Sequence, residues 1–527
     1  MHHHRPPPLA STSQPLIGMT SAQNLQLDVL KEIFEYLAAI SEPRWRNEGS
    51  STRFDLGWIY AAHVCRRWRD VGLDLAQLWA AHVCSLPNVH ASEDLLKRTK
   101  SCPLKIEVLY GRTQLPRIHF ALRNLDRVES ITCYPSYDWE EALRERGRLP
   151  LLRHLHLSQD IAYDPATLIL DAPLLQTVSL ENAIMMPSPS SAISYSSLRS
   201  LSITGVNSSP TPAWEILTLL SRTPHLQHLY LQLLRRHSNG NGQWEHYNGK
   251  PVHLAHLETV RLIGGWKTDV AGFWSHIRAP GDVDADFSFQ RDSPVGIMEA
   301  LSCQLPSTMH DTCTIIIEPQ LERQAVSFSS SNITPAGHRS QVKINFGTRG
   351  IEEILSLLSR RPQMDRIRSC VLRLSQPRFS NIELVLVTFI RKLPSVTNLL
   401  LDMGDRGSFD PFIHHLVDPE TTTIIFPKLR TLSVRFNPDV IRGDPGLLYV
   451  EWWSSLCDML ARRSDAGMKL KELRLVGQWS WTAEEVATVD GELMSALRDS
   501  SSVEELVDER SWRPSLVDSS TPTVSVH

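Results

Sequence analysis

The chain has 527 residues, of which 42% are hydrophobic and 21% are charged, and its formal net charge is −4. This balance is typical of folded soluble proteins and argues against a surface that coats nucleic acid. No run of about 18 uncharged apolar residues occurs, so the sequence predicts no membrane-spanning helix and no membrane partner. The eight cysteines include no CxxC pair, so we expect reduced thiols, no metal site and a cytoplasmic or nuclear location.

The first amphipathic segment follows an N-terminal tail, residues 1–22, that we expect to be disordered. Asn24 is a plausible helix cap, and Asp28 places an acidic group near the helix N-terminus, where the helix dipole favours it. Five apolar residues then follow the spacing of one broad helical face: Val29, Leu30, Ile33, Phe34 and Leu37. Residues 41–55 interrupt this pattern with proline, glycine and serine, and they indicate a loop.

Two more short helices are predicted before residue 85. The second is expected from about Leu56 to Val71, and the third carries Leu75, Leu78 and Trp79. Three short helices in about 60 residues cannot bury all their large apolar side chains alone. Their exposed patch either binds a partner or packs on the rest of the same chain.

These segments carry a resemblance to a known family. LQLDVLKEIFEYL, then HVCRRWRDVGLDLAQLW, and the later phrase LLKRTKSCPLKIEV at 95–108 are similar to the F-box motif of the large fungal F-box families. The resemblance implies that residues 23–85 bind a Skp-type adaptor, which connects to a cullin-RING ubiquitin ligase. Carried over by position, the adaptor contacts would be Leu25, Asp28, Leu30, Ile33, Phe34, Val64, Cys65, Trp68, Leu78 and Trp79. Two features depart from the family: Gln26 follows Leu25 where the family usually has proline, and the insert after the first helix is long.

A template L-x-x-L-x-L recurs through the rest of the chain. Copies start at residues 128, 152, 175, 198, 226, 257, 396, 429 and 470. Degenerate strands are expected at 286–290, 314–318, 343–347 and 372–375, and polar loops at 187–197, 237–251 and 327–341. Amphipathic segments at 213–224, 351–362, 382–394 and 450–463 predict helices between the strands.

The first six copies are spaced in or near the range of leucine-rich repeats, about 20–29 residues. The fold class expected is therefore α/β: a three-helix F-box, then an irregular leucine-rich-repeat solenoid over residues 86–510. We expect about twelve or thirteen short parallel strands on its concave side, because each repeat buries its apolar face only against its neighbours. Residues 511–527 are expected to form a disordered tail.

The same template predicts a face for a protein target. Period-two alternation buries the leucines and turns their neighbours to the opposite face. Interface energy concentrates in tyrosine, tryptophan and arginine, so the expected target anchors are Tyr230, Arg261, Arg435 and Arg474. The alternative is that these are ordinary solvated strand residues.

Motifs for chemistry are weak. His225 and His228 form an H-x-x-H pair, as do His253 and His256, but the template aligns His256 with His225 and His228 with Thr259. The four histidines therefore do not make one metal site, and neither G-x-S-x-G nor H-E-x-x-H occurs. We expect no catalytic residue and no cofactor. The sequence favours a ubiquitin-ligase substrate receptor, the alternative being a leucine-rich interaction scaffold without a ligase role, and a hydrolase in the long loops is the third reading.

Overall fold

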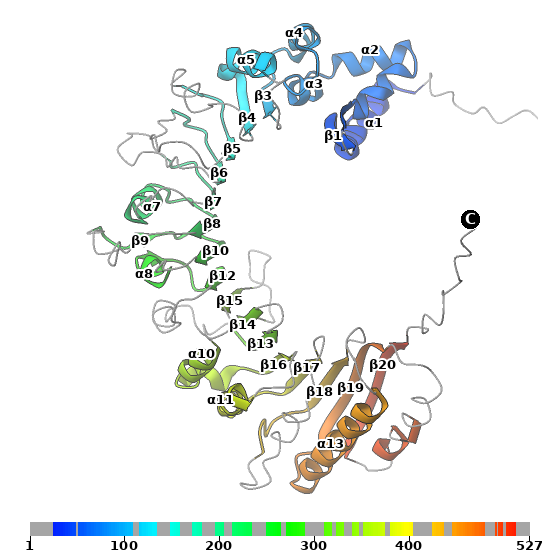
Figure 1. Ribbon diagram of the computed structural model, residues 1–527. Coiled ribbons are helices and arrows are strands. Elements are labelled where there is room, and N and C mark those ends of the chain that lie inside the picture. Colours follow the sequence, from blue (N-terminus) through cyan, green and yellow to red (C-terminus); the bar gives the residue numbers. More distant parts are fainter. Residues whose placement is uncertain are drawn as a thin grey trace, which may run out of the picture. The chain divides into compact units, whose positions relative to one another are not determined.

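The computed structural model has a mixed α/β architecture with a large sheet and several helices (Figure 1). Contacts divide the chain into two compact units: Met1–Gln159 with Leu168–Leu175, and Asp160–Thr167 with Gln176–His527. The structure describes these residues: 25–48, 51–108, 115–133, 148–158, 171–181, 195–204, 213–233, 249–264, 270–289, 310–318, 323–330, 340–346, 351–374, 380–403, 424–436, 445–479, 491–492, 494–498 and 502–512. Nearly all of both predicted tails lies outside these ranges.

The first unit is helical before it becomes a sheet. Its helices are α1 Leu27–Ile40, η2 Gly57–His63, α2 Arg66–Asp74, α3 Ala76–His82, α4 Val89–Leu96, η3 Lys97–Thr99, α5 Leu115–Arg123 and η5 Leu125–Arg127. Its strands are β1 Arg44–Glu48, β2 Ser51–Asp55, β3 Leu104–Val108, β4 Val128–Cys133 and β5 His154–Ser158. Helix α1 begins after Gln26 rather than at the expected Asn24 cap, and α3 confirms the third predicted helix.

The prediction of a loop over residues 41–55 is wrong. Strands β1 and β2 pair there as an antiparallel hairpin in which Trp45 lies opposite Phe54. The two rings are 5.3 Å apart at their centroids, and an ion pair of 2.7 Å joins Arg46 to Asp55. A cross-strand aromatic pair stabilises such a hairpin, and this signal outweighs the loop-forming residues around it.

The second predicted helix is also wrong as a single element. It is divided into the 3-10 turn η2 and helix α2, because Cys65 between them has an extended backbone with φ −159° and ψ 174°. At the start of η2, Gly57 has φ +52°, a conformation that glycine adopts without strain. A Cβ atom at this position would also collide with the backbone of Ser41 and Glu42.

Residues 25–86, here called the N-terminal module, share one aromatic core. Phe34 contacts Trp58 edge-on with centroids 6.0 Å apart, and Trp58 contacts Trp79 at 4.9 Å. The indole N–H of Trp79 donates to the carbonyl of Gly72 at 2.8 Å, so this buried polar group is satisfied. A Cβ atom on Gly72 would lie 3.0 Å from the Phe34 ring, so glycine allows α2 to approach α1 closely.

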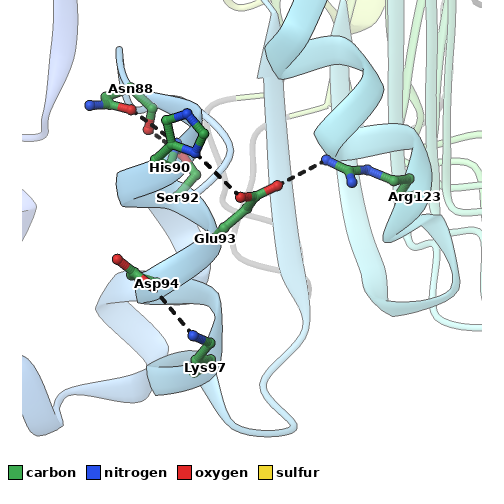
Figure 2. Close-up of polar contacts among 7 residues, drawn as sticks. All are labelled: Asn88, His90, Ser92, Glu93, Asp94, Lys97 and Arg123. Carbon is green, nitrogen blue, oxygen red and sulfur yellow. Dashed lines mark hydrogen bonds and ion pairs between the residues drawn. The ribbon is translucent and has the colours of Figure 1, made fainter.

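Helix α4 is fixed by polar contacts that Figure 2 shows. The Asn88 side chain caps the helix by accepting from the backbone N–H of His90 at 2.9 Å. Glu93 reaches across to Arg123 at the end of α5, with 3.2 Å between the charged atoms (Figure 2). The cap thus fixes the start of α4, and the ion pair links α4 to α5, which follows β3 in the chain.

The template strands form where the sequence places them. In the first unit, β3, β4 and β5 are parallel neighbours. In the second unit the strand order is β6-β7-β8-β10-β12-β15-β14-β13-β16-β17-β18-β19-β20 (Figure 1). Strand bounds in this unit are β6 Thr177–Glu181, β7 Ser200–Thr204, β8 His228–Leu233, β9 Val252–His253, β10 Thr259–Gly264, β11 Ile277–Arg278, β12 Asp284–Phe289, β13 Thr312–Glu318, β14 Arg323–Ser329, β15 Gln341–Phe346, β16 Ser369–Leu374, β17 Asn398–Met403, β18 Thr431–Phe436, β19 Leu470–Trp479 and β20 Val503–Trp512. Strand β20 takes in Ser511 and Trp512, which the sequence assigned to the tail.

Burial follows the period of two that the template requires. The first leucine of a copy is buried just before the strand, as at Leu175 and Leu226, and buried residues then alternate with partly exposed ones. The four degenerate strands expected between residues 286 and 375 are β12, β13, β15 and β16.

The expectation of purely parallel strands is wrong at one place. Strand β14 is antiparallel to both β13 and β15, and β15 rather than β13 lies next to β12. Residues 327–329, expected in a loop, belong to β14. The three strands form a meander whose order across the sheet is the reverse of its order in the chain. Strand β15 lies next to β12, and β13 pairs in parallel with β16.

Helices occupy the connections, as the four amphipathic segments predicted. They are α7 Ala213–Leu220, α8 Val270–Ser275, α10 Ile351–Leu358, η7 Pro362–Arg366, α11 Ser380–Ile390 and α13 Pro445–Asp465. Among the described residues, no helix combines the length and apolar character needed to cross a bilayer. None of the described cysteines is in a disulfide, and burial raises the pKa of the Cys84 and Cys370 thiols to about 12.

Candidate interaction surfaces

The residues carried over as adaptor contacts fall into two groups. Leu30, Phe34 and Trp79 are almost fully buried in the core of the N-terminal module. Their side chains hold α1, η2 and α3 together and are not on the surface. A change at any of them acts on the stability of the module before it acts on any partner.

The other seven residues reach solvent to different degrees. Asp28 and Val64 are exposed, while the rest are half-buried: Leu25, Ile33, Cys65, Trp68 and Leu78. The Trp68 ring packs against Phe34 with centroids 5.8 Å apart, so one side of Trp68 belongs to the core. Arg67 beside it donates to the carbonyl of Leu25 at 2.5 Å and ties α2 to the start of α1.

Helix α1 presents a second apolar face that the sequence reading did not separate from the first. Val29, Tyr36 and Ile40 are 37%, 68% and 64% exposed, and Ile33 between them is half-buried. Their spacing of four, three and four residues aligns them on one side of the helix. We call these four residues the α1 stripe. The sequence placed Val29 and Ile33 in one broad face with Leu30 and Phe34 and passed over Tyr36 and Ile40, although the same spacing was there to find them.

The 3-10 turn η2 adds further exposed apolar surface. Tyr60 is 52% exposed, and Val64, directly after η2, is 59% exposed. Helix α2 is different, since Arg66 and Asp70 face solvent there as an ion pair of 3.9 Å. The large exposed apolar side chains described in the module therefore lie on α1 and η2, and a patch of this kind is typical of a partner surface.

In the second unit, the predicted target anchors lie on the partly exposed face of the strands, here called the polar face. Tyr230 on β8 lies opposite Arg261 on β10, and the guanidinium is 5.5 Å from the ring centroid. Arg261 also forms an ion pair of 3.6 Å with Asp286 on β12. Asn345 donates to the same Asp286 carboxylate at 2.6 Å, so this group of side chains is held by one another.

Arg474 on β19 is held by acidic neighbours. It forms an ion pair of 2.6 Å with Glu472 and one of 3.4 Å with Glu509 on β20. The hydrogen bonds that Arg474 donates to Glu472, together with the nearby negative charges, raise the pKa of Arg474 above its ordinary value. Its positive charge is therefore compensated from two sides.

Arg435 on β18 is placed differently. Its side chain is 49% exposed, and its guanidinium lies 3.9 Å from Asp402 on β17. Asp402 is only 7% exposed, and Arg373 on β16 binds the same carboxylate oxygen with bonds of 2.9 and 2.6 Å. The sequence did not predict Arg373 or Asp402 as site residues, because no charge pattern marks them in their own strands. Only the lateral register brings them together.

The histidine pairs lie as the template aligned them. His225 and His256 are ring neighbours with centroids 5.3 Å apart, and His228 Nδ1 is 2.9 Å from the Thr259 hydroxyl. Within the described ranges, no group of three or more histidine, cysteine or acidic side chains is arranged to hold a metal ion.

Comparisons with known proteins add no family to these observations. No protein-family model matches the chain, and no curated protein sequence matches it.

Proposed function

We propose that the chain is the substrate-recognition subunit of an SCF-type ubiquitin ligase. In this proposal residues 23–85 bind a Skp-type adaptor, and the strands of residues 86–510, arranged as a leucine-rich-repeat solenoid, hold a protein target. The chain itself supplies no catalytic residue. Transfer of ubiquitin belongs to the cullin-RING assembly that the adaptor recruits.

The observation that carries the proposal is the α1 stripe on a module whose sequence resembles an F-box. Tyr36 and Ile40 are each about two-thirds exposed on a helix whose core residues Leu30 and Phe34 are fully buried. Leaving such side chains in water forgoes roughly 1.5–3 kcal/mol for each one that a partner would bury. An adaptor that covers the stripe accounts for their position on the surface.

The buried residues of the motif support the proposal in another way. Leu30, Phe34 and Trp79 build the core that sets the angle between α1 and α3. The sequence similarity in LQLDVLKEIFEYL and HVCRRWRDVGLDLAQLW thus includes residues that determine the shape of the module as well as residues that face outward. Tyr36 and Ile40 join the expected contacts Ile33 and Val64.

An interaction scaffold without a ligase role is the second candidate, and Gln26 is the observation that favours it. Gln26 replaces the usual proline at the cap of α1, where its side chain makes no capping hydrogen bond. A module that no longer binds its adaptor would tolerate that replacement.

Adaptor binding separates the two candidates. We expect the full-length chain to co-purify with a recombinant Skp-type adaptor, and Tyr36→Glu with Ile40→Glu to weaken that binding at least about tenfold, because two charges would enter an apolar interface. The matched control is Leu384→Glu on α11, which changes an apolar residue that is 72% exposed in the second unit. Equal binding by the stripe variant and the control would move the adaptor site away from α1, and no binding by the unmutated chain would favour the scaffold.

A further inference from the structure

The polar face of the second unit carries a charge cluster whose parts come from three neighbouring strands. Arg373 on β16 lies beside Asp402 on β17, and Asp402 lies beside Arg435 on β18. Parallel strands lie about 4.8 Å apart, so the two guanidinium groups approach the carboxylate from opposite sides. Asp402 is 7% exposed, whereas the side chains of Arg373 and Arg435 are 40% and 49% exposed.

The carboxylate is shared unequally. Arg373 places Nε and Nη2 at 2.9 and 2.6 Å from one oxygen of Asp402, the short distances of charge-assisted hydrogen bonds. Arg435 has its ion-pair contact in the described structure with that same oxygen, at 3.9 Å. Beyond about 3.5 Å no hydrogen bond forms, so Arg435 keeps its donors available.

Apolar neighbours on both sides raise the strength of this cluster. The lateral row continues from Arg373 to Ile316 on β13 and from Arg435 to Val476 on β19. The next row along the strands places Val371 beside Leu400, and all four aliphatic side chains are half-buried. A charge beside aliphatic surface loses part of its screening by water, so an anion docked there is bound more strongly than at an open surface.

The other predicted arginine anchors lack this combination. Arg474 has Glu472 at 2.6 Å and Glu509 at 3.4 Å. Arg261 has Asp286 at 3.6 Å and the Tyr230 ring beneath it. Of the arginines expected to anchor a target, Arg435 therefore has the least compensated charge.

We propose that the cluster of Arg435, Arg373 and Asp402 is the site that receives an acidic side chain of the target, a carboxylate or a phosphoryl group. The anion contacts Arg435 directly. Arg373 stays paired with Asp402, and this pairing orients the Arg373 guanidinium. The flanking aliphatic residues contact the neighbouring side chains of the same segment. This inference rests on the proposed function in that it names the class of target for the same polar face.

Selection from a random peptide library displayed on ribosomes tests the site without knowledge of the target. The full-length chain is used as bait in its unmutated form and as Arg435→Gln and Arg435→Glu, with Arg360→Gln, an exposed arginine just after helix α10, as the matched control. We expect the unmutated chain to enrich aspartate and glutamate over the starting library, and binding of an enriched peptide to fall about tenfold in Arg435→Gln. Arg435→Glu should reverse the preference toward lysine and arginine, and Arg360→Gln should keep the acidic preference.

A second arm separates the two anions. The library is treated with serine and threonine kinases before selection, and enrichment of phosphorylated peptides above their acidic counterparts assigns the site to a phosphoryl group. Enrichment of aspartate and glutamate alone assigns it to a carboxylate. The proposal is overturned if the unmutated chain enriches no acidic or phosphorylated residue, or if Arg435→Gln enriches them equally. Adaptor binding measured on the same variants should not change, so failure of this site and failure of the adaptor proposal give different results.

Discussion

His310 should make part of the second unit sensitive to acid. Its side chain is 1% exposed, just before β13, and its Nε2 lies 3.1 Å from the hydroxyl of Ser340, just before β15. Burial lowers the pKa of His310 from 6.5 to about 4. Between these two values the unfolded segment binds a proton and the folded segment does not, so stability is complete above pH 6.5 and falls as the pH approaches 4.

The size of the loss follows from the shift. One pKa unit corresponds to about 1.4 kcal/mol, so the segment should lose on the order of 3 kcal/mol between pH 7 and pH 4 through this group. Amide hydrogen exchange of β13, β14 and β15 at both pH values measures the free energy of opening. In His310→Gln, the difference in the free energy of opening between pH 7 and pH 4 should be smaller by about 3 kcal/mol than in the unmutated chain.

The matched control is His225→Gln, which removes an exposed histidine of the same unit. Carboxylates contribute to acid sensitivity in every variant and cancel in the comparison. If His310→Gln and His225→Gln lose the same free energy as the unmutated chain between the two pH values, the coupling of His310 to the fold is refuted.

Three further substitutions test individual positions. Gln26→Pro should raise the free energy of unfolding of the N-terminal module by roughly 0.4–1 kcal/mol in a denaturant titration, because Gln26 already has φ −64° and proline fixes that angle; a loss of stability would contradict the cap geometry. Gly57→Ala should cost about 2 kcal/mol or more in the same titration, through a positive φ and a backbone collision, whereas Gly281→Ala, with open space around its Cβ, should have little effect. Arg463→Ala should lower the melting temperature of the second unit by removing about 3 kcal/mol, since buried Arg463 donates to the carbonyls of Ile425 and Phe426 at 2.9 and 3.0 Å; a change within error would show that water replaces the guanidinium there.

Much of the sheet can be predicted from local sequence, because the pattern of each template copy indicates which of its residues are buried. A leucine before the strand and alternating apolar residues within it identify β6, β7, β8 and β10 without any knowledge of neighbours. The order of strands across the sheet is another matter. Nothing in residues 312–346 says that β15 rather than β13 pairs with β12, since that choice depends on contacts between segments distant in the chain.

The surfaces were predictable only in part for a related reason. Apolar spacing identified α1 as amphipathic. In a helix with two apolar faces, however, the face that packs in the core can be assigned only when the positions of the neighbouring elements are known. Phe34 meets Trp58 and Trp68, and this packing leaves Tyr36 and Ile40 outside. In the same way, Arg435 was found from the alternation of its own strand, whereas Asp402 and Arg373 became part of the site only through register.

Assembly with purified ligase components tests whether the chain is a subunit of an SCF-type ubiquitin ligase. The full-length chain is mixed with a Skp-type adaptor, a cullin and a RING subunit, and the mass of the complex is measured by light scattering after gel filtration. We expect one complex that contains all four proteins and that requires the adaptor. When Tyr36 and Ile40 are both changed to glutamate, only this chain should be lost from the complex. Elution of the unmutated chain by itself, with the adaptor bound only to the cullin, would contradict the claim.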